Sequence, residues 1–210
     1  MRTYASALRI ASLLVVAPLA ACTHHNGPPG TPTGNDLIIN DVGTIEFADS
    51  VNNCPTPAGE GDIKLTFDNG ETRVKGECKG GVKVGKWKGW YTNGALAWKA
   101  EFTDGLLDGD FVSYHPNDKK RSQLTYRKGK GEGTLKAWYY NGEKRMQGEF
   151  SDGKKNGCWE TWHDNGQKAT KGTYSDDMQV KTWLAWTPTG SKSKQELGGS
   201  AAHGECLITL

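Results

Sequence analysis

The segment Gly133–Asn156 reads GTLKAWYYNGEKRMQGEFSDGKKN and decides the fold of this 210-residue chain. An aromatic run precedes Asn141-Gly142, and a second run follows and ends at Phe150 before a turn rich in glycine and lysine. Asn-Gly between two runs with strand character is the strongest short signal for a β-hairpin, because both residues of a type I′ turn need φ > 0. We therefore expect a β-hairpin closed by a type I′ turn at Asn141 and Gly142.

The same pattern recurs along the chain every 24 residues, without insertion or deletion between residues 61 and 190. The blocks start at Gly61, Gly85, Gly109, Gly133 and Gly157, and a more divergent sixth block starts at Lys181. Fixed periods of this length are typical of repeat proteins. We expect an all-β fold in which hairpins stack edge to edge into an elongated antiparallel repeat array, each block advancing roughly 10 Å.

Positions are counted here from the first residue of each block. Because side chains alternate along a strand, positions 3, 5, 7, 14, 16 and 18 share an apolar face, and the other face is polar except at position 6. A two-residue turn pairs position 3 with 16 and position 6 with 13. Trp159 then lies opposite Gly172, and we expect its ring to cover that glycine.

Position 6 places a line of aromatic rings on the otherwise polar face. The line consists of Trp90, Tyr114, Trp138, Trp162 and Trp186. Two interpretations remain open. In the first, the rings are structural and pack over position 13, as when Trp138 stacks on Arg145. Alternatively, they form a binding surface, since contiguous exposed aromatic side chains often mark interaction sites.

The repeated residues also resemble a known family. The pattern G-x-W-x-x-W/Y-Y/H-x-N-G, followed by G-E-F-x-D-G-K-x-x-G, resembles the MORN repeat variant of bacterial YwqK-like proteins, many of which are labelled as antitoxin components. The resemblance covers about 130 of the 210 residues. It implies a β-hairpin array used as an interaction or scaffold module, and it carries over no catalytic residue and no cofactor.

Residues 1–21 read as an export signal. Arg2 and Arg9 give a positive start, and the apolar run that follows is too short for a membrane-spanning helix. The segment ends Leu19-Ala20-Ala21-Cys22, which resembles the lipobox of bacterial lipoproteins. We expect cleavage before Cys22, lipidation of its thiol and a stable anchor in the bacterial cell envelope. Thr rather than Asp at residue 23 favours the outer membrane. An ordinary signal peptide is the alternative.

The remaining segments flank the repeats. Residues 22–36 contain several Pro and Gly and predict a flexible tether. We expect residues 37–60 to form an N-terminal cap with short strands near 37–39 and 44–47. Residues 61–190 are the repeats, and residues 191–210 are the C-terminal cap, with a last strand at 207–210. Caps are expected because a repeat array exposes open edges.

Four cysteines remain beyond Cys22, and an even number in an exported chain permits two disulfides. Cys54 with Cys78, and Cys158 with Cys206, is the favoured pairing, because each bond fastens an irregular end onto the array. Cys78 and Cys158 lie roughly 30 Å apart in such an array, far beyond the ~7 Å Cα limit. Free thiols are the alternative.

Charge and motifs exclude several function classes. Without the two Arg of the signal, the chain has 24 basic and 24 acidic side chains, which argues against general nucleic-acid binding. His115 and His163 both occupy position 7, about 20 Å apart, so they cannot share a metal. The glutamates at position 17 (Glu77, Glu101 and Glu149) lie just too far apart for a glycosidase pair. No catalytic motif or cofactor fingerprint is found.

These observations favour a non-enzymatic, lipid-anchored envelope protein that binds another protein or organises a surface complex. Glycan binding along the aromatic line is one alternative. An antitoxin-like or immunity-like inhibitor acting in the envelope is another.

Overall fold

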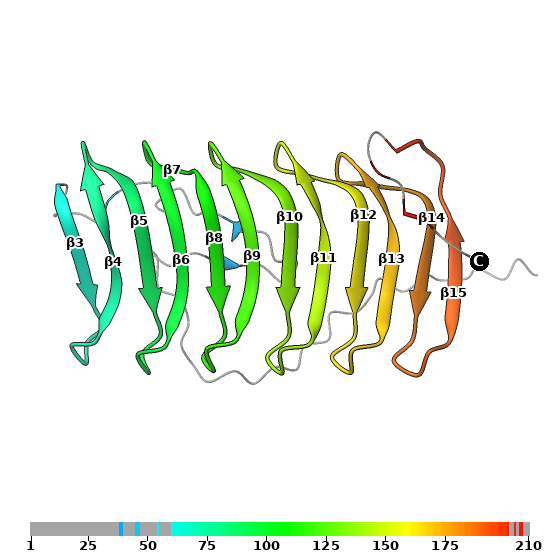
Figure 1. Ribbon diagram of the computed structural model, residues 1–210, viewed down its shortest axis with the longest axis horizontal. Coiled ribbons are helices and arrows are strands. Elements are labelled where there is room, and N and C mark those ends of the chain that lie inside the picture. The colour runs from blue at the N-terminus through cyan, green and yellow to red at the C-terminus, as the bar shows by residue number, and fades with distance from the viewer. Residues whose placement is uncertain are drawn as a thin grey trace, which may run out of the picture.

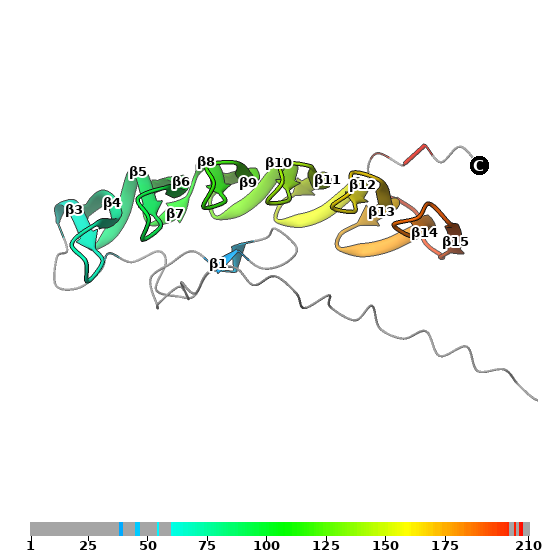
Figure 2. The same ribbon diagram turned by 90° about the horizontal axis from the view of Figure 1, so that it is seen from below.

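The computed structural model describes residues 38–39, 45–46, 54, 60–201, 204 and 206–207. Within this part of the chain, one antiparallel sheet of 13 strands runs up and down in sequence order, and there is no helix (Figure 1). Viewed along its edge, the sheet is a single elongated layer (Figure 2). The all-β hairpin array predicted from the sequence is confirmed.

Each block forms one hairpin. The hairpins are β3 (Gly61–Thr66) with β4 (Thr72–Lys79), β5 (Val82–Trp90) with β6 (Leu96–Thr103), β8 (Gly109–Tyr114) with β9 (Lys120–Arg127), β10 (Lys130–Trp138) with β11 (Lys144–Ser151), β12 (Lys154–Trp162) with β13 (Lys168–Ser175), and β14 (Met178–Trp186) with β15 (Lys192–Glu196). The short β7 (Leu106–Leu107) also pairs with β6. Two further strands, β1 (Ile38–Ile39) and β2 (Ile45–Glu46), pair only with each other.

The hairpin loops do not have the predicted type I′ geometry. The amide of Gly142 donates to the carbonyl of Tyr139 at 2.9 Å, which makes a β-turn centred on Tyr140 and Asn141. Gly142 has φ +95°, whereas Asn141 is not among the residues of positive φ. The loop is therefore a turn followed by one left-handed glycine, the three-residue arrangement with a bulge, because only one residue leaves the ordinary φ range.

This bulge changes the pairing at the end of the strand. Leu135 lies opposite Gly148 and Ala137 opposite Met146, as predicted, but Trp138 lies opposite Lys144. Position 6 thus faces position 12, and the predicted pairing with position 13 is wrong. The same shift occurs at the ends of β3, β5, β8 and β12.

Two-residue turns with both residues at positive φ lie at the opposite edge of the sheet, where each hairpin joins the next. Asp152 (φ 52°) and Gly153 (φ 81°) connect the paired residues Ser151 and Lys154. The equivalent pairs are Gly80-Gly81, Asp104-Gly105, Lys128-Gly129 and Asp176-Asp177. The type I′ signal of this sequence therefore lies at positions 20 and 21, between blocks.

The core is the predicted apolar face. Trp87 and Leu135 are fully buried there, and Trp159 is 3% exposed. A Cβ built on Gly148 would overlap the ring of Trp159, and one on Gly172 would overlap the ring of Trp183. Each tryptophan thus covers the glycine of the preceding hairpin, and the prediction that Trp159 covers Gly172 is corrected. The ring leans toward the preceding hairpin, so the cover joins neighbouring repeats.

Aromatic rings then continue the core from hairpin to hairpin. Phe150 meets Trp159 edge to face at 5.3 Å between ring centroids, Trp159 meets Tyr174 at 5.6 Å, and Tyr174 meets Trp183 at 5.1 Å. Such pairs add about 0.5–1.5 kcal/mol beyond the burial of their area. Stability in this array therefore comes mainly from contacts between neighbours.

The disulfides join Cys54 to Cys78 and Cys158 to Cys206, the pairs favoured from the sequence. Cys78 lies in the core of the apolar face. Cys158 occupies position 2, on the polar face, where the amide of Cys206 also donates to Thr173 Oγ1 at 3.1 Å. The two ends of the chain are therefore fastened to opposite faces of the sheet.

The predicted caps differ from the structure in two respects. In the N-terminal segment, β1 and β2 do not extend the sheet beyond β3, and most of residues 37–60 lies outside the described residues. At the other end, Lys192–Glu196 pairs with β14 as the second strand of the sixth hairpin, so the array continues past residue 190. Leu207 is not in a strand, and residues 208–210 lie outside the described part, as do residues 1–36 with Cys22.

Candidate functional site: the polar face

The hairpin loops are bonded to one another along one edge of the sheet. The side chain at position 7 of one block donates to the carbonyl at position 6 of the next. The bonds run from Tyr91 to Tyr114 (2.7 Å), His115 to Trp138 (3.0 Å), Tyr139 to Trp162 (2.7 Å) and His163 to Trp186 (2.8 Å). Because a carbonyl only accepts, the histidines carry the proton on Nε2. They replace tyrosine in the same role, and burial raises the pKa of Tyr139.

The asparagine at position 9 adds a second bond between loops. Asn141 Oδ1 accepts from the amide of Glu143 at 2.9 Å, and its Nδ2 donates to the carbonyl of Asp164 in the next loop at 2.8 Å. Asn117 and Asn165 make the same pair of bonds. One residue thus orders its own loop and fixes the distance to the next.

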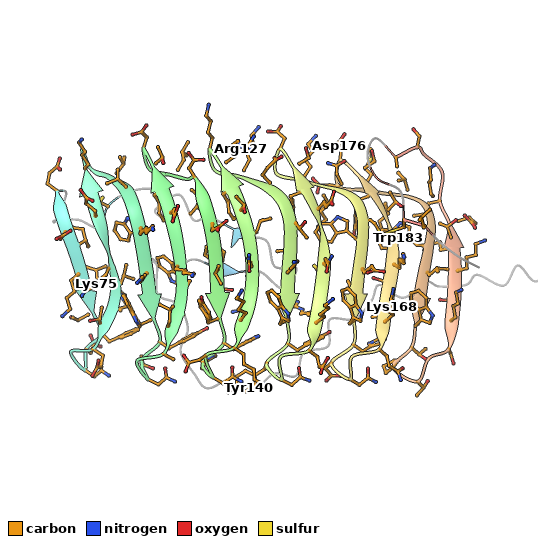
Figure 3. The ribbon with its side chains drawn as sticks, viewed as in Figure 1. Lys75, Arg127, Tyr140, Lys168, Asp176 and Trp183 are labelled. Carbon is orange, nitrogen blue, oxygen red and sulfur yellow. A yellow bond between two sulfur atoms is a disulfide. The ribbon has the colours of Figure 1, made fainter. Side chains whose placement is uncertain are left out.

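The opposite edge has an equivalent bond. A side chain at position 24 accepts from the backbone amide at position 20 of the following block. The acceptors are Glu60 for Gly80 (2.7 Å), Asp108 for Lys128, Glu132 for Asp152 and Asn156 for Asp176 (each 3.2 Å). Both edges of the array are therefore fixed by bonds between repeats, and the sheet between them is held as one surface. Figure 3 shows Tyr140 at the loop edge, and Arg127 and Asp176 at the other.

The aromatic line at position 6 lies on the polar face, with every ring half-buried. The bulge in each loop brings lysines from position 12 into this line. Ammonium groups lie over three of the rings: Lys120 over Trp138 (5.9 Å to the ring centroid), Lys144 over Trp162 (5.5 Å) and Lys192 over Trp186 (5.9 Å). The cation over Trp138 is therefore Lys120 of the preceding hairpin, and the predicted stacking on Arg145 is wrong, because the bulge displaces position 13.

This cover distinguishes the rings from one another. A lysine over a half-buried ring occupies the face that a ligand would need, which favours the packing interpretation for Trp138, Trp162 and Trp186. Trp90 differs, because Leu96 lies opposite it and Thr72 holds position 12 of the preceding block. Among the described residues, no ammonium lies over the ring of Trp90.

A second row runs across the middle of the polar face. Lys64 lies directly opposite Lys75, Lys75 opposite Lys88, and Lys88 opposite Lys99. Like charges placed directly opposite one another destabilise a sheet. We refer to these four residues as the lysine row. They belong to the first two hairpins, and sequence reasoning missed them as a set, although positions 4 and 15 of the first two blocks are all lysine.

Toward the other end of the face, the row includes an acidic residue. Glu160 lies in the continuation of this row and pairs with Lys168 at 2.7 Å and Lys171 at 3.4 Å. Burial alone would raise the pKa of Glu160, but hydrogen bonds and charge from these lysines outweigh burial and lower it. These two lysines therefore share an acidic partner within the protein.

The described residues contain no group of three or more His, Cys, Asp or Glu side chains arranged to hold a metal ion. Of the glutamates at position 17, Glu101 pairs with Lys86 at 3.7 Å. The described residues include no helix of the length and apolar character needed to cross a membrane.

Comparison with known proteins supports the repeat assignment. The family model described as the MORN repeat variant matches residues 107–128 and 155–176, which include β8 and β9, and β13 with all of β12 except its first residue. The chain therefore carries repeats of this type. No curated protein matches the chain. A crystal structure of a GtfA/B complex bound to UDP and GlcNAc aligns with a TM-score of 0.22 and 8% identity. The alignment covers 53% of this chain and 22% of that chain.

Proposed function

We propose that this protein is a non-enzymatic scaffold of the bacterial cell envelope, anchored by lipid on Cys22, whose polar face binds another protein. The observation that carries the proposal is the pair of bonded edges, which hold the hairpins as one long, stiff surface. MORN repeats are commonly interaction modules, and such a surface costs little conformational entropy on binding. The scaffold role ranks ahead of glycan binding along the whole aromatic line, because lysines cover three of its rings.

Two measurements test the two parts of the proposal. A photo-reactive amino acid placed at Lys136, which is exposed on the polar face, should give a discrete protein adduct in intact cells. The same group at Lys128, which is exposed in a turn at the sheet edge, is the matched control and should give none. Adducts of equal yield at both positions, or none at Lys136, would overturn the assignment of the binding face. A toxin in the adduct would favour the antitoxin-like role.

The anchor is tested separately. The Cys22→Ser variant should move from the detergent phase to the aqueous phase on phase separation, because it cannot receive the acyl chains. If the variant remains in the detergent phase like the wild type, the lipid-anchor part of the proposal is wrong, whatever the cross-linking shows.

A further inference from the structure

We propose that the first two hairpins bind an acidic oligosaccharide, whose carboxylates contact the lysine row while one sugar ring packs against Trp90. This inference goes beyond the scaffold function. It assigns a local site, on two of the hairpins, to a ligand of a different chemical class.

The lysine row is a concentration of unneutralised charge. Its members come from four successive strands, β3 to β6, spaced about 4.8 Å apart, so the row spans roughly 14 Å along the array. All four side chains are exposed, and within the described part of the chain none of them is ion-paired. Their mutual repulsion costs stability in the free protein. A ligand with negative charges repeated along its length would remove that repulsion.

The fold itself does not require lysine at these positions. In later hairpins the same row continues through Val112, Gln123, Lys136, Gln147 and Glu160, each opposite the next across β8 to β12. Apolar, amide and acidic side chains are all accommodated there. The repeats thus provide an internal comparison, and the four consecutive lysines are a property of the first two hairpins alone in this series.

The surface is hollowed where the lysines lie. One groove of about 500 Å³ is lined by Lys64, Lys75, Lys88 and Trp90, and a neighbouring groove of about 420 Å³ is lined by Lys88 and Lys99. Counting every lining residue, six lysines face four carboxylates. Glu101 and Lys86 neutralise one another at 3.7 Å, which leaves five lysines and three carboxylates, an excess of two positive charges. The grooves are therefore complementary to an anion.

Trp90 selects a sugar among the possible polyanions. It lies two residues from Lys88 on the same strand and face, and its ring has no lysine cover. A flat apolar ring beside a cation matches a pyranose that carries a carboxylate, since the ring packs on the aromatic face and the charge meets the ammonium. Nucleic acid fits less well, because the chain beyond residue 21 carries 24 basic and 24 acidic side chains, without the excess of positive charge typical of nucleic-acid-binding domains.

The test measures binding of a galacturonic acid hexamer to the full-length chain in detergent at low salt, with the neutral galactose hexamer as its counterpart. We expect the acidic hexamer to bind and the neutral one not to bind. The double variant K75Q/K88Q removes two ion pairs and should weaken binding about tenfold. Its urea midpoint should equal or exceed that of the wild type, because repulsion is relieved.

Two controls make the result specific. K136Q changes a lysine of the same row whose neighbours are Gln123 and Gln147, and it should leave the affinity unchanged. Trp90→Ala should weaken binding, whereas Trp162→Ala, whose ring is covered by Lys144, should not.

The proposal is overturned if the wild type does not bind the acidic hexamer, or if K75Q/K88Q binds it as tightly as the wild type. It is also overturned if K136Q loses as much affinity as the double variant. A single-stranded oligonucleotide that binds as tightly, with the same response to the variants, would refute the assignment to a sugar. None of these outcomes depends on the cross-linking result, so this site and the scaffold function fail separately.

Discussion

The most informative single substitution in this array is Gly148→Ala, because it adds one methyl group under a buried ring. The added Cβ would overlap the ring of Trp159. That ring cannot move freely, since it is wedged between Phe150 at 5.3 Å and Tyr174 at 5.6 Å, and its Nε1 donates to the carbonyl of Asn156 at 3.1 Å. Relief of the overlap therefore disturbs two ring contacts and one hydrogen bond.

The cost can be worked from these contacts. Overpacking of a dense core costs about 1–3 kcal/mol, and loss of the indole hydrogen bond adds about 1 kcal/mol. Alanine in a strand regains about 0.5–1 kcal/mol relative to glycine. The net loss is then roughly 1–3.5 kcal/mol, which lowers the thermal midpoint of a chain of this size by about 2–14 °C. Gly198→Ala is the matched control, because a Cβ there meets nothing within 4 Å.

The chain itself indicates which second substitution should compensate. The equivalent positions of the second and third blocks hold Ala100 and Phe111, both buried in the same core, so alanine occurs here together with a smaller ring. The double variant Gly148→Ala/Trp159→Phe copies that pair and should be more stable than the sum of its single variants predicts, by at least ~1 kcal/mol. Urea unfolding of the four proteins measures the coupling. If the losses simply add within about 0.5 kcal/mol, the ring does not cover the glycine as described.

Three further predictions concern the bonds at the loops and the charges beside them. Asn141→Ala should cost about 1 kcal/mol more in urea unfolding than Asn69→Ala, because only the former also loses a bond to the next loop; equal losses would contradict that bond. His163→Phe should lose about 1 kcal/mol while His163→Tyr should retain stability, and a stable Phe variant would refute the donor role. The depressed pKa of Glu160 stabilises the fold above its ordinary value of 4.5, and this contribution is lost as the pH falls through the lower folded pKa. Glu160→Gln should therefore reduce the acid sensitivity of the urea midpoint, and an unchanged pH profile would refute the pairing with Lys168.

Much of the fold follows from the sequence because the period is unbroken. Alternation along the strands correctly assigned the apolar face, including Trp87 and Phe102, and the pairing of positions 3 and 16 holds where Leu135 meets Gly148. The type of loop was not predicted correctly, because Asn-Gly supports both a two-residue turn and a turn followed by a left-handed glycine. The distinction depends on one φ angle, at Asn141, which the residue type leaves open.

The bulge in the loop determines which cation lies beside Trp138 in the candidate site. A two-residue turn would place Arg145 beside Trp138, whereas the bulged loop places lysine there and covers the ring with Lys120. The direction in which the Trp159 ring leans could not be predicted from the sequence either, because Gly148 and Gly172 lie on either side of it and are equally small. Which of two neighbouring hairpins a side chain packs against depends on packing in three dimensions, and the sequence pattern does not specify it.

A repeat array separates structural from functional residues by its own internal variation. Positions 7 and 9 keep a donor in most blocks because every loop must bond to the next, and His163 can replace tyrosine only by donating the same bond. Positions 4 and 15 make no such bond between loops, and the charge of their side chains varies along the polar face. In the first two hairpins, however, positions 4 and 15 hold lysine on four successive strands. These lysines repel one another and have no ion-pair partner in the described part of the chain, and the fold does not require lysine there. We therefore expect the first two hairpins to be the part of the array that binds an external ligand.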